Sequence, residues 1–353
     1  MTEQNRERTI NHWAGKPWDT GELSYWAQLP TVQRRLAEKE SDQPDKNWID
    51  HTLETYFQER LPLERCLSLG CGQGRVERLW AERQAFESCD AFDISPDSIA
   101  EARELAVTSG FNNIHYAVSD INQIELPEQC YDLVWAVASV HHFANLEHVF
   151  SQVARALKKD GLFIMHEYVG ANHFQFDDRQ RQVINACLDL LPEQYRKLPP
   201  VSKAVGSLSS TIPNHQGSAW MLRRTFDKIR EGTLLSTAGR FWRKRRAARL
   251  GQRPVKETTL PTLRSVLSID PSEAVRSADI IPVLKNQFEI IEYKPLGGTI
   301  LQFLLAGIAG NFQDKTGEQL LDIIFRLEDT LMECGDLNSD FAFIVARPQI
   351  EAL

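Results

Sequence analysis

The chain has 353 residues, more than one typical domain, and its 42% hydrophobic and 25% charged residues exclude a fibrous or disordered protein. Its net charge of -8 argues against a duplex nucleic-acid substrate, because proteins that bind duplexes usually carry a basic charge overall. No apolar run reaches the roughly 20 residues of a membrane span, and the polar N-terminus is unlike a secretory signal, so we expect a cytoplasmic protein.

The first 62 residues are expected to form a helical N-terminal extension. Apolar residues recur at helical spacing around 32–36 and 48–57. Three tryptophans, Trp13, Trp18 and Trp26, are expected to act as packing anchors in this extension.

A turn with glycine at every second position follows the mostly apolar residues 66–69. Gly70, Gly72 and Gly74 lead into a helical pattern, so this stretch predicts a strand, a tight turn and a helix. A ligand can approach a backbone closely only where no Cβ intervenes, and the following helix N-terminus offers free N–H groups. Arg75 occupies the place of the third glycine of a dinucleotide fingerprint, which disfavours pyrophosphate as the ligand.

Residues 67–74 resemble the first motif of the class I S-adenosylmethionine-dependent methyltransferases. The resemblance implies an α/β, Rossmann-like sheet of seven mostly parallel strands with an antiparallel last strand, and S-adenosyl-L-methionine as the cofactor. The family usually has an acidic residue where this chain has Ser68, and that acid helps to hold the amino group of the cofactor. The positions that the resemblance places around the cofactor are Ser68, Gly70, Cys71, Gly72, Gly74, Asp93, Ile94, Asp120, Ile121 and Ala136.

Two of these positions are acids that follow the next two predicted strands. Asp93 ends a strand at 90–93 and lies 23 residues beyond Gly70, close to the spacing of roughly 20 at which a carboxylate meets ribose hydroxyls. A third strand is predicted at 114–118, and the resemblance implies that Asp120, just after it, reaches the adenine amino group. A plain turn cap is the alternative for Asp120.

The chain also carries local signals for helix ends. Ser95 before a proline predicts an N-cap and the first position of a helix. Asp177 with Gln180 predicts a capping box. The two lysines at 158–159 are expected to close a helix over 146–157, because cations suit the negative end of a helix dipole.

The apolar run 131–137 predicts a fourth strand covered on both faces, with a histidine-containing loop at its carboxyl end. Ligands of open α/β sheets lie at this end of the strands. If the methyl acceptor is a hydroxyl, a general base must take its proton, and histidine has a suitable pKa. The candidates, each with a structural role as the alternative, are His142, Glu167, His141, His166 and His173.

The alternation of strands and helices stops after residue 169 and resumes near residue 287. We expect the intervening part to be an inserted, mainly helical lid for substrate recognition. The predicted parts are the helical extension 1–62, the cofactor-binding core 63–169, the inserted region 170–286 and the C-terminal part of the core sheet, 287–353.

Basic charge is concentrated in the second half of this insertion. Between Arg223 and Lys256 there are twelve Lys or Arg and two acids, a local charge of +10. The segment from Arg240 to Lys256 has no acid at all. It is expected to attract a phosphate-bearing or lipid-linked substrate, another polyanion or an anionic membrane surface, with a solvated helix face as the alternative.

The six cysteines show neither a C-x-x-C pair nor a nearby His-x-x-x-His sequence. Zinc ligands normally come at such spacings, so buried reduced thiols are expected. No ligand cluster in the sequence calls for a metal.

These features predict an S-adenosylmethionine-dependent methyltransferase acting on a small molecule or saccharide, with a hydroxyl as the expected acceptor. The loop after the fourth strand lacks the Asn/Asp-Pro-Pro-Tyr/Phe pattern of amino-group methylation and the Pro-Cys pair of cytosine methylation. Two other functions remain open. One is an RNA methyltransferase that contacts phosphates through residues 240–256. The other is a non-catalytic partner protein that keeps the cofactor fold, for which Ser68 is the best support.

Overall fold

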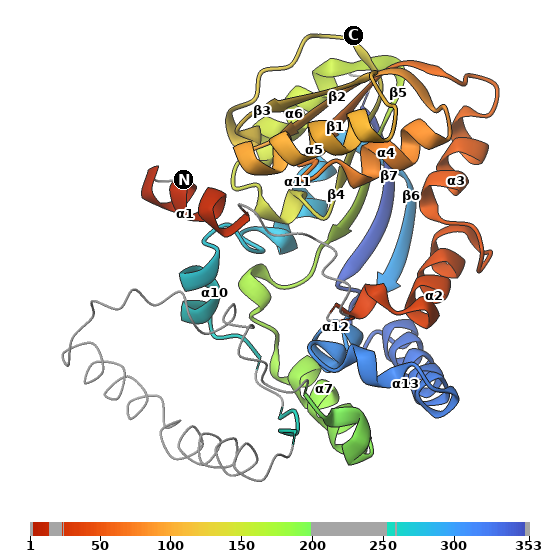
Figure 1. Cartoon of the computed structure of the whole chain (residues 1–353), viewed down its shortest axis with the longest axis vertical. Helices are drawn as coiled ribbons and strands as arrows, with labels where there is room; N and C mark the ends of the chain where they lie inside the picture. The colour runs from red at the N-terminus through yellow and green to blue at the C-terminus, as the bar shows by residue number, and fades with distance from the viewer. Residues whose placement is uncertain (1–2, 14–22, 24, 199–252, 258–259, 350–353) are drawn as a thin grey trace.

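The computed structural model describes residues 3–13, 23, 25–198, 253–257 and 260–349. Within them seven strands form one sheet in the order β3-β2-β1-β4-β5-β7-β6 (Figure 1). The strands are β1 (Leu63–Leu69), β2 (Phe86–Asp93), β3 (Ile114–Val118), β4 (Tyr131–Val137), β5 (Leu157–Tyr168), β6 (Phe288–Gly297) and β7 (Phe341–Pro348). Strands β1 to β5 pair in parallel, and β7 lies antiparallel between β5 and β6. The predicted Rossmann-like fold is confirmed.

Helices cover both faces of this sheet (Figure 1). They are α1 (Glu3–Trp13), α2 (Pro30–Ser41), α3 (Trp48–Thr52), α4 (Arg75–Glu82), α5 (Pro96–Thr108), α6 (Leu146–Ala156), α7 (Asp178–Leu190), α10 (Leu263–Ile269), α11 (Ile280–Leu284), α12 (Leu301–Leu305) and α13 (Lys315–Glu333). Apolar residues of α2, α3, α4 and α5 join one core cluster, and those of α6 and α11 join another on the opposite face. Helices α7, α12 and α13 lie beyond the carboxyl ends of β5 and β6 (Figure 1).

The predicted helix starts are confirmed with one exception. The hydroxyl of Ser95 accepts a hydrogen bond from the Ser98 backbone N–H, and α5 begins with the proline. Asp177 caps α7 by accepting from the Gln180 N–H at 2.8 Å. The Gln180 side chain does not turn back to complete a capping box, because it donates to Asp340 at 2.7 Å and ties α7 to the start of β7.

The predicted role of the two lysines after α6 is wrong. The helix ends at Ala156, and β5 begins at once with Leu157, so both lysines lie in the strand. Lys158 forms ion pairs with Glu64 at 2.6 Å and with Asp132 at 3.0 Å. Its partners come from β1 and β4, and pairing across the sheet outweighs the local preference for a helix end.

Part of the basic segment can be placed. Residues 240–252 lie outside the described residues. The guanidinium of Arg253 donates to the backbone carbonyl of Leu198 at 2.8 Å. The ammonium of Lys256 donates to the carbonyls of Phe303 and Ala306 around the end of α12, and burial lowers its pKa to about 8. These two cations therefore serve the fold of the chain itself.

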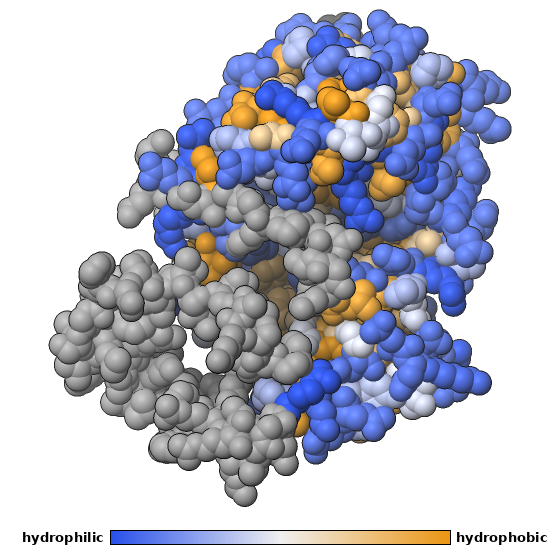
Figure 2. Space-filling view, viewed as in Figure 1, coloured by the Kyte–Doolittle hydropathy of each residue, from blue (hydrophilic) through white to orange (hydrophobic). Residues whose placement is uncertain are grey.

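The described helices and one face of the molecule can be compared with what a membrane span requires. Among the helices that the structure describes, none is long and apolar enough to cross a bilayer. In the view of Figure 2, apolar residues of the described part form small patches between polar ones.

A buried ion pair joins the N-terminal extension to the C-terminal helix. Glu328 of α13 is fully buried and accepts from Arg35 of α2 at 2.8 Å. Its carboxylate also accepts from the backbone N–H groups of Gly298 and Ile300. A buried carboxylate with this many donors fixes the turn after β6 as well as the two helices.

We expect Glu328→Ala to lower the free energy of unfolding by about 3–5 kcal/mol, because it leaves the buried Arg35 with only the partly exposed Asp329 as a charge partner and removes the acceptor of the Gly298 and Ile300 N–H groups. Urea denaturation followed by circular dichroism measures the change. The matched control is Asp322→Ala on the same helix, since Asp322 forms an exposed pair with Arg326. Equal stability of the two variants would show that the buried pair does not hold the extension in place.

Candidate functional site: the carboxyl edge of β1, β2 and β4

The glycine-rich turn has the geometry that its sequence predicts. Gly70, Gly72 and Gly74 have φ angles of +75°, +52° and +72°, a region that favours glycine. A Cβ added to Gly70 would lie 2.4 Å from the Cβ of Ser139 in the loop after β4. One added to Gly72 would meet no heavy atom of the described residues within 4 Å. The turn therefore packs on the loop after β4 and leaves open space beside Gly72.

Asp93 holds the turn against the end of β2. One carboxylate oxygen accepts from the Gly72 N–H at 2.9 Å, and the other accepts from the Ser95 N–H at 2.8 Å. Burial raises the pKa of Asp93, and these two hydrogen bonds oppose the shift. Each oxygen has a second lone pair, so the carboxylate can also accept from two adjacent hydroxyls of a ligand.

A carboxylate lies next to Ser68 although position 68 is not acidic. The Ser68 hydroxyl donates to Glu77 of α4 at 2.5 Å, and the indole of Trp135 donates to the same oxygen at 3.2 Å. Glu77 is almost fully buried, and burial raises its pKa. Sequence reasoning missed Glu77, which follows Ser68 by nine residues on a different element, and no spacing rule connects the two.

Asp120 caps the short 3-10 helix after β3, as its alternative interpretation predicts. Its carboxylate accepts from the Asn122 N–H at 3.1 Å and lies 3.5 Å from the guanidinium of Arg6 in α1. Adenine contact by Asp120 remains a prediction. Of the apolar positions predicted around the cofactor, Ile94 is half-buried, Ile121 is buried and Ala136 is fully buried inside β4.

The loop after β4 is organised by Glu167 of β5. This side chain is 0% exposed and accepts from the backbone N–H groups of Ser139 at 2.8 Å and Val140 at 2.6 Å. It also accepts from the Tyr168 N–H at 2.7 Å and contacts Nδ1 of His141 at 2.5 Å. Because an ionised carboxylate only accepts hydrogen bonds, Nδ1 of His141 carries a proton, and Nε2 is the ring nitrogen that does not contact Glu167.

The two neighbouring histidines have opposite electrostatics. Burial lowers the pKa of His141, but the charge and the hydrogen bond of Glu167 outweigh burial and raise the pKa to about 9. Burial lowers the pKa of His142, and the adjacent His141 lowers it further, to about 4. Their ring centroids are 4.1 Å apart, too close for both rings to carry a proton charge comfortably.

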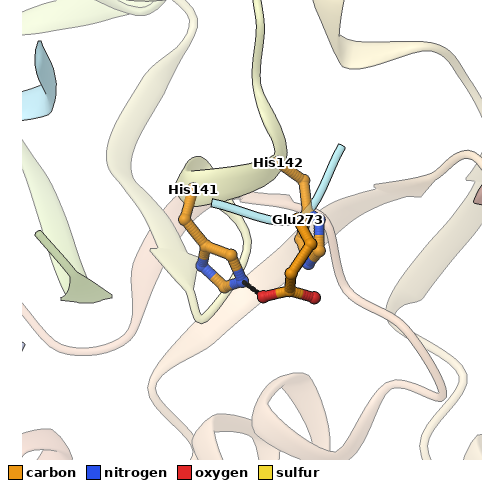
Figure 3. A group of neighbouring side chains, drawn as sticks. All are labelled: His141, His142 and Glu273. Atoms are coloured by element: carbon orange, nitrogen blue, oxygen red, sulfur yellow. Dashed lines mark ion pairs between the residues drawn. The ribbon is translucent and has the colours of Figure 1, made fainter. Parts of the chain in front are cut away.

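A segment about 130 residues further along the chain completes the cluster. Nδ1 of His142 lies 3.0 Å from the Ser272 hydroxyl and 3.6 Å from Asp270. Glu273 lies 3.7 Å from Nε2 of His141 (Figure 3). Sequence reasoning missed all three of these residues, and no signal in one sequence links them to the histidines.

Helix α1 of the N-terminal extension packs against the same cluster. Thr9 donates to Asp270 at 2.9 Å, and the indole of Trp13 donates to Asp270 at 3.0 Å. The Trp13 ring stands edge-on to His142, with centroids 5.4 Å apart. Together with the contact between Arg6 and Asp120, this places α1 along the edge where β3 and β4 end.

The side chains of two other candidates, His166 and His173, are not part of the cluster of His141, His142 and Glu273. His166 points to the opposite face of the sheet from Glu167, since neighbours in a strand alternate, and its Nε2 lies 2.8 Å from Glu40 of α2. Nδ1 of His173 lies 2.8 Å from the backbone carbonyl of Glu273, so His173 helps to fix that segment. Glu167 itself is enclosed, so it can act on a ligand only through His141.

Comparison with known proteins matches this region to one family. Residues 67–165 match the family described as methyltransferase domain. The match starts in β1 and runs to β5, and so contains the glycine-rich turn, Asp93, Asp120 and His141. Residues 67–165 are a class I S-adenosylmethionine-dependent methyltransferase domain.

Curated relatives of the methyltransferase domain act on several acceptors, as their names state. A malonyl-[acyl-carrier protein] O-methyltransferase of Serratia marcescens is 26% identical over 36% of this chain and 50% of its own length. The enzyme of that name from Acetivibrio thermocellus is 31% identical over 33% of this chain and 41% of its own. A sterol 4-C-methyltransferase of Caenorhabditis elegans is 24% identical over 36% of this chain and 39% of its own. The chain spans half or less of each of these relatives.

Among solved structures, one similar protein is an N-methyltransferase of Haemonchus contortus in complex with S-adenosylhomocysteine. The aligned region covers 86% of this chain and 53% of that protein. Its sequence identity is 16% and its TM-score is 0.44.

The residues of the methyltransferase domain fit S-adenosylmethionine. The bare turn leaves open space at Gly72, and Asp93 keeps lone pairs for two hydroxyls. The buried carboxyl group of Glu77 accepts from Ser68, at the position where the resemblance predicts an acid near the amino group.

We expect Asp93→Asn to weaken binding of S-adenosylmethionine about tenfold or more, because hydrogen bonds to a charged acceptor contribute about 1.5–3 kcal/mol. Isothermal titration calorimetry measures the affinity, and the melting temperature reports whether the turn survives. Asp97→Asn, an exposed carboxylate in the first turn of α5, is the matched control. Unchanged affinity of a folded Asp93→Asn protein would contradict the ribose role.

Proposed function

We propose that this chain transfers a methyl group from S-adenosylmethionine to a hydroxyl of a small molecule or saccharide, with His141 as the general base. The observation that carries the proposal is the Glu167–His141 pair. Glu167 holds Nδ1 of His141 at 2.5 Å, so Nε2 is the nitrogen left to meet an acceptor. The His141 ring is partly accessible, with 11% of its side chain exposed, whereas Glu167 is sealed.

The position of His141 beside the glycine-rich turn supports the proposal. Ser139 precedes His141 by two residues, and its hydroxyl donates to the carbonyl of Leu69 at 2.7 Å. Its Cβ also fills the space where Gly70 could have a side chain. The loop that carries the base is therefore in direct contact with the turn that would hold the cofactor.

Methyl transfer to a hydroxyl requires a proton acceptor and accurate positioning of the hydroxyl relative to the methyl group. S-adenosylmethionine supplies, when bound, an electrophilic methyl group on a sulfonium. Neutral His141 would take the proton of the acceptor hydroxyl on Nε2, so that the oxygen could attack the methyl group that the bound cofactor would supply. Glu167 stabilises the resulting imidazolium. Holding both reactants in line supplies much of the acceleration.

The acceptor class draws support from two sides. The curated relatives carry the names of O- and C-methyltransferases of acyl-carrier-bound and sterol acceptors, and this chain matches only parts of them. The pair of His141 and Glu167 favours a hydroxyl among these acceptors, because an aliphatic hydroxyl must lose its proton during transfer. The proposal also includes a phosphate-bearing or lipid-linked saccharide as the acceptor. Basic residues in 240–252 would then bind its phosphate groups or the anionic membrane surface that carries it.

The structure bears on the two other functions only in part. The non-catalytic interpretation rested on the missing charge at Ser68, and Glu77 brings a carboxylate to that place. The RNA interpretation used residues 240–256 as phosphate contacts. Of these, Arg253 and Lys256 are bonded to backbone carbonyls of the chain, and residues 240–252 lie outside the described residues.

We expect His141→Ala to lower kcat about 10²- to 10⁴-fold and to leave the affinity for S-adenosylmethionine unchanged. Purified protein is incubated with the cofactor and a panel of hydroxylated acceptors, and mass spectrometry reads acceptor methylation. His115→Ala is the control, since His115 is an exposed residue on β3. Full activity of His141→Ala on a methylated acceptor would remove the base from the proposal.

The pH dependence follows from the direction of the His141 shift. A pKa raised to about 9 means that His141 is protonated, and unable to accept a proton, throughout the neutral range. We expect kcat/KM to rise about tenfold per pH unit and to level off near pH 9. Glu167→Gln removes the charge that raises this pKa, so its profile should level off at lower pH. A profile that is flat from pH 6 to pH 9 would contradict the role of His141.

A further inference from the structure

Two imidazoles and one carboxylate converge at the end of β4. One ligand atom each of His141, His142 and Glu273 lies within 4.8 Å of the others (Figure 3). The side chains of the two histidines and Glu273 are 11%, 17% and 22% exposed, so they are held in place without being sealed. The sequence predicts no metal site, because Glu273 lies 131 residues beyond His142 and spacing cannot connect them.

The hydrogen bonds fix which nitrogen of His142 is free. The Ser272 hydroxyl donates its proton to Asp270 at 2.7 Å. It can therefore only accept from Nδ1 of His142, 3.0 Å away, so the proton of His142 lies on Nδ1. The lone pair is then on Nε2, for which no partner is recorded among the described residues.

His141 is arranged in the same way by a different partner. Its Nδ1 is held by Glu167 at 2.5 Å, and its Nε2 faces Glu273 at 3.7 Å. Metal-bound histidines in proteins almost always donate their second ring N–H to a carboxylate or another acceptor, which fixes the ring and raises its basicity. Glu167 supplies this support directly, and Asp270 supplies it through Ser272.

Charge balance alone explains the position of His141 but not that of His142. One protonated His141 between Glu167 and Glu273 would satisfy both carboxylates without any help from His142. The ordering of His142 by Ser272 and Asp270, next to His141 and Glu273, has no role in such an ion pair.

We propose that His141, His142 and Glu273 form a binding site for a divalent first-row transition-metal ion, with Zn²⁺ as the preferred occupant. Two imidazoles and a carboxylate suit zinc, whereas Mg²⁺ and Ca²⁺ prefer oxygen ligands. Tetrahedral bonds of about 2.0–2.1 Å place ligand atoms about 3.3 Å apart. The side chains must therefore close by about 1.5 Å at most, a movement within reach of the partly exposed Glu273.

The site has a consequence for catalysis. A bound ion uses the Nε2 lone pair of His141, which is the lone pair that the proposed base needs. The ion and the acceptor proton therefore compete, and metal occupancy switches the base off. This consequence rests on the proposed function, whereas the binding site does not.

Binding is tested with Co²⁺, a spectroscopic substitute for zinc, added to the full-length protein after treatment with a chelator. We expect one ion per chain and visible absorption typical of nitrogen and oxygen ligands. His142→Ala and Glu273→Gln should each weaken binding more than about tenfold. The matched controls His115→Ala and Glu87→Gln, both exposed, should bind as the parent does.

Two results would overturn the site. One is the absence of a visible band at saturating Co²⁺. The other is a band that persists with the same affinity in a folded Glu273→Gln protein, which retains the size of the side chain and loses only its charge. Neither result depends on finding a methyl acceptor.

The link to catalysis is tested with Zn²⁺ and any acceptor that the enzyme methylates. We expect stoichiometric Zn²⁺ to suppress transfer by more than about tenfold, and a chelator to restore it. In Glu273→Gln the same Zn²⁺ concentration should suppress transfer less. Bound Zn²⁺ that leaves transfer unchanged would show that the metal ion and the base do not share the lone pair.

Discussion

The site depends on the hydrogen bonds that the buried carboxylate of Glu167 accepts. A charge without access to water is tolerated only when donors surround it, and here three backbone N–H groups and one imidazole do so. Because two of those N–H groups belong to the residues just before His141, the same carboxylate sets the path of the loop and the direction of the ring. Ser139 of that loop packs on Gly70, so the cofactor turn and the base are placed by one set of contacts.

Asp270 performs the corresponding task for the second histidine, using parts of the chain that are far apart. It accepts from Thr9 and Trp13 of α1 and from the Ser272 hydroxyl, which in turn orients His142. The N-terminal extension and the segment around Ser272 are thus joined at one buried carboxylate, and both reach the edge where β4 ends. The structure of this edge therefore requires the N-terminal helix, which lies outside the matched methyltransferase domain.

Strands β3 and β4, the glycine-rich turn and the cap of α5 could be predicted from the sequence, because their signals lie within a few consecutive residues. The end of α6 was predicted to within one residue, but the role of Lys158 was not, because Lys158 is held by Glu64 and Asp132 of other strands, which local sequence cannot reveal. The candidate site shows the same division. His141 follows β4 and Glu167 lies near the end of β5, so both stand at recognisable places in the strand order, whereas Glu77 and Glu273 are brought in by packing. The acid that the motif expects at position 68 of β1 is replaced by Glu77 of α4, and a motif read along one strand cannot show this.

The adjacent histidines show why residue type alone does not assign a role. Both are buried, and burial by itself lowers the pKa of each. What separates them is the partner of Nδ1. His141 meets the full charge of Glu167 directly, so its protonated form is stabilised. His142 meets the neutral hydroxyl of Ser272, which places the charge of Asp270 one group further away, and the nearby His141 disfavours a second proton. One ring therefore retains a proton that must leave before it can act, while the other keeps its lone pair available at neutral pH. Two environments push the two pKa values apart, as in other sites where identical groups divide a task between them.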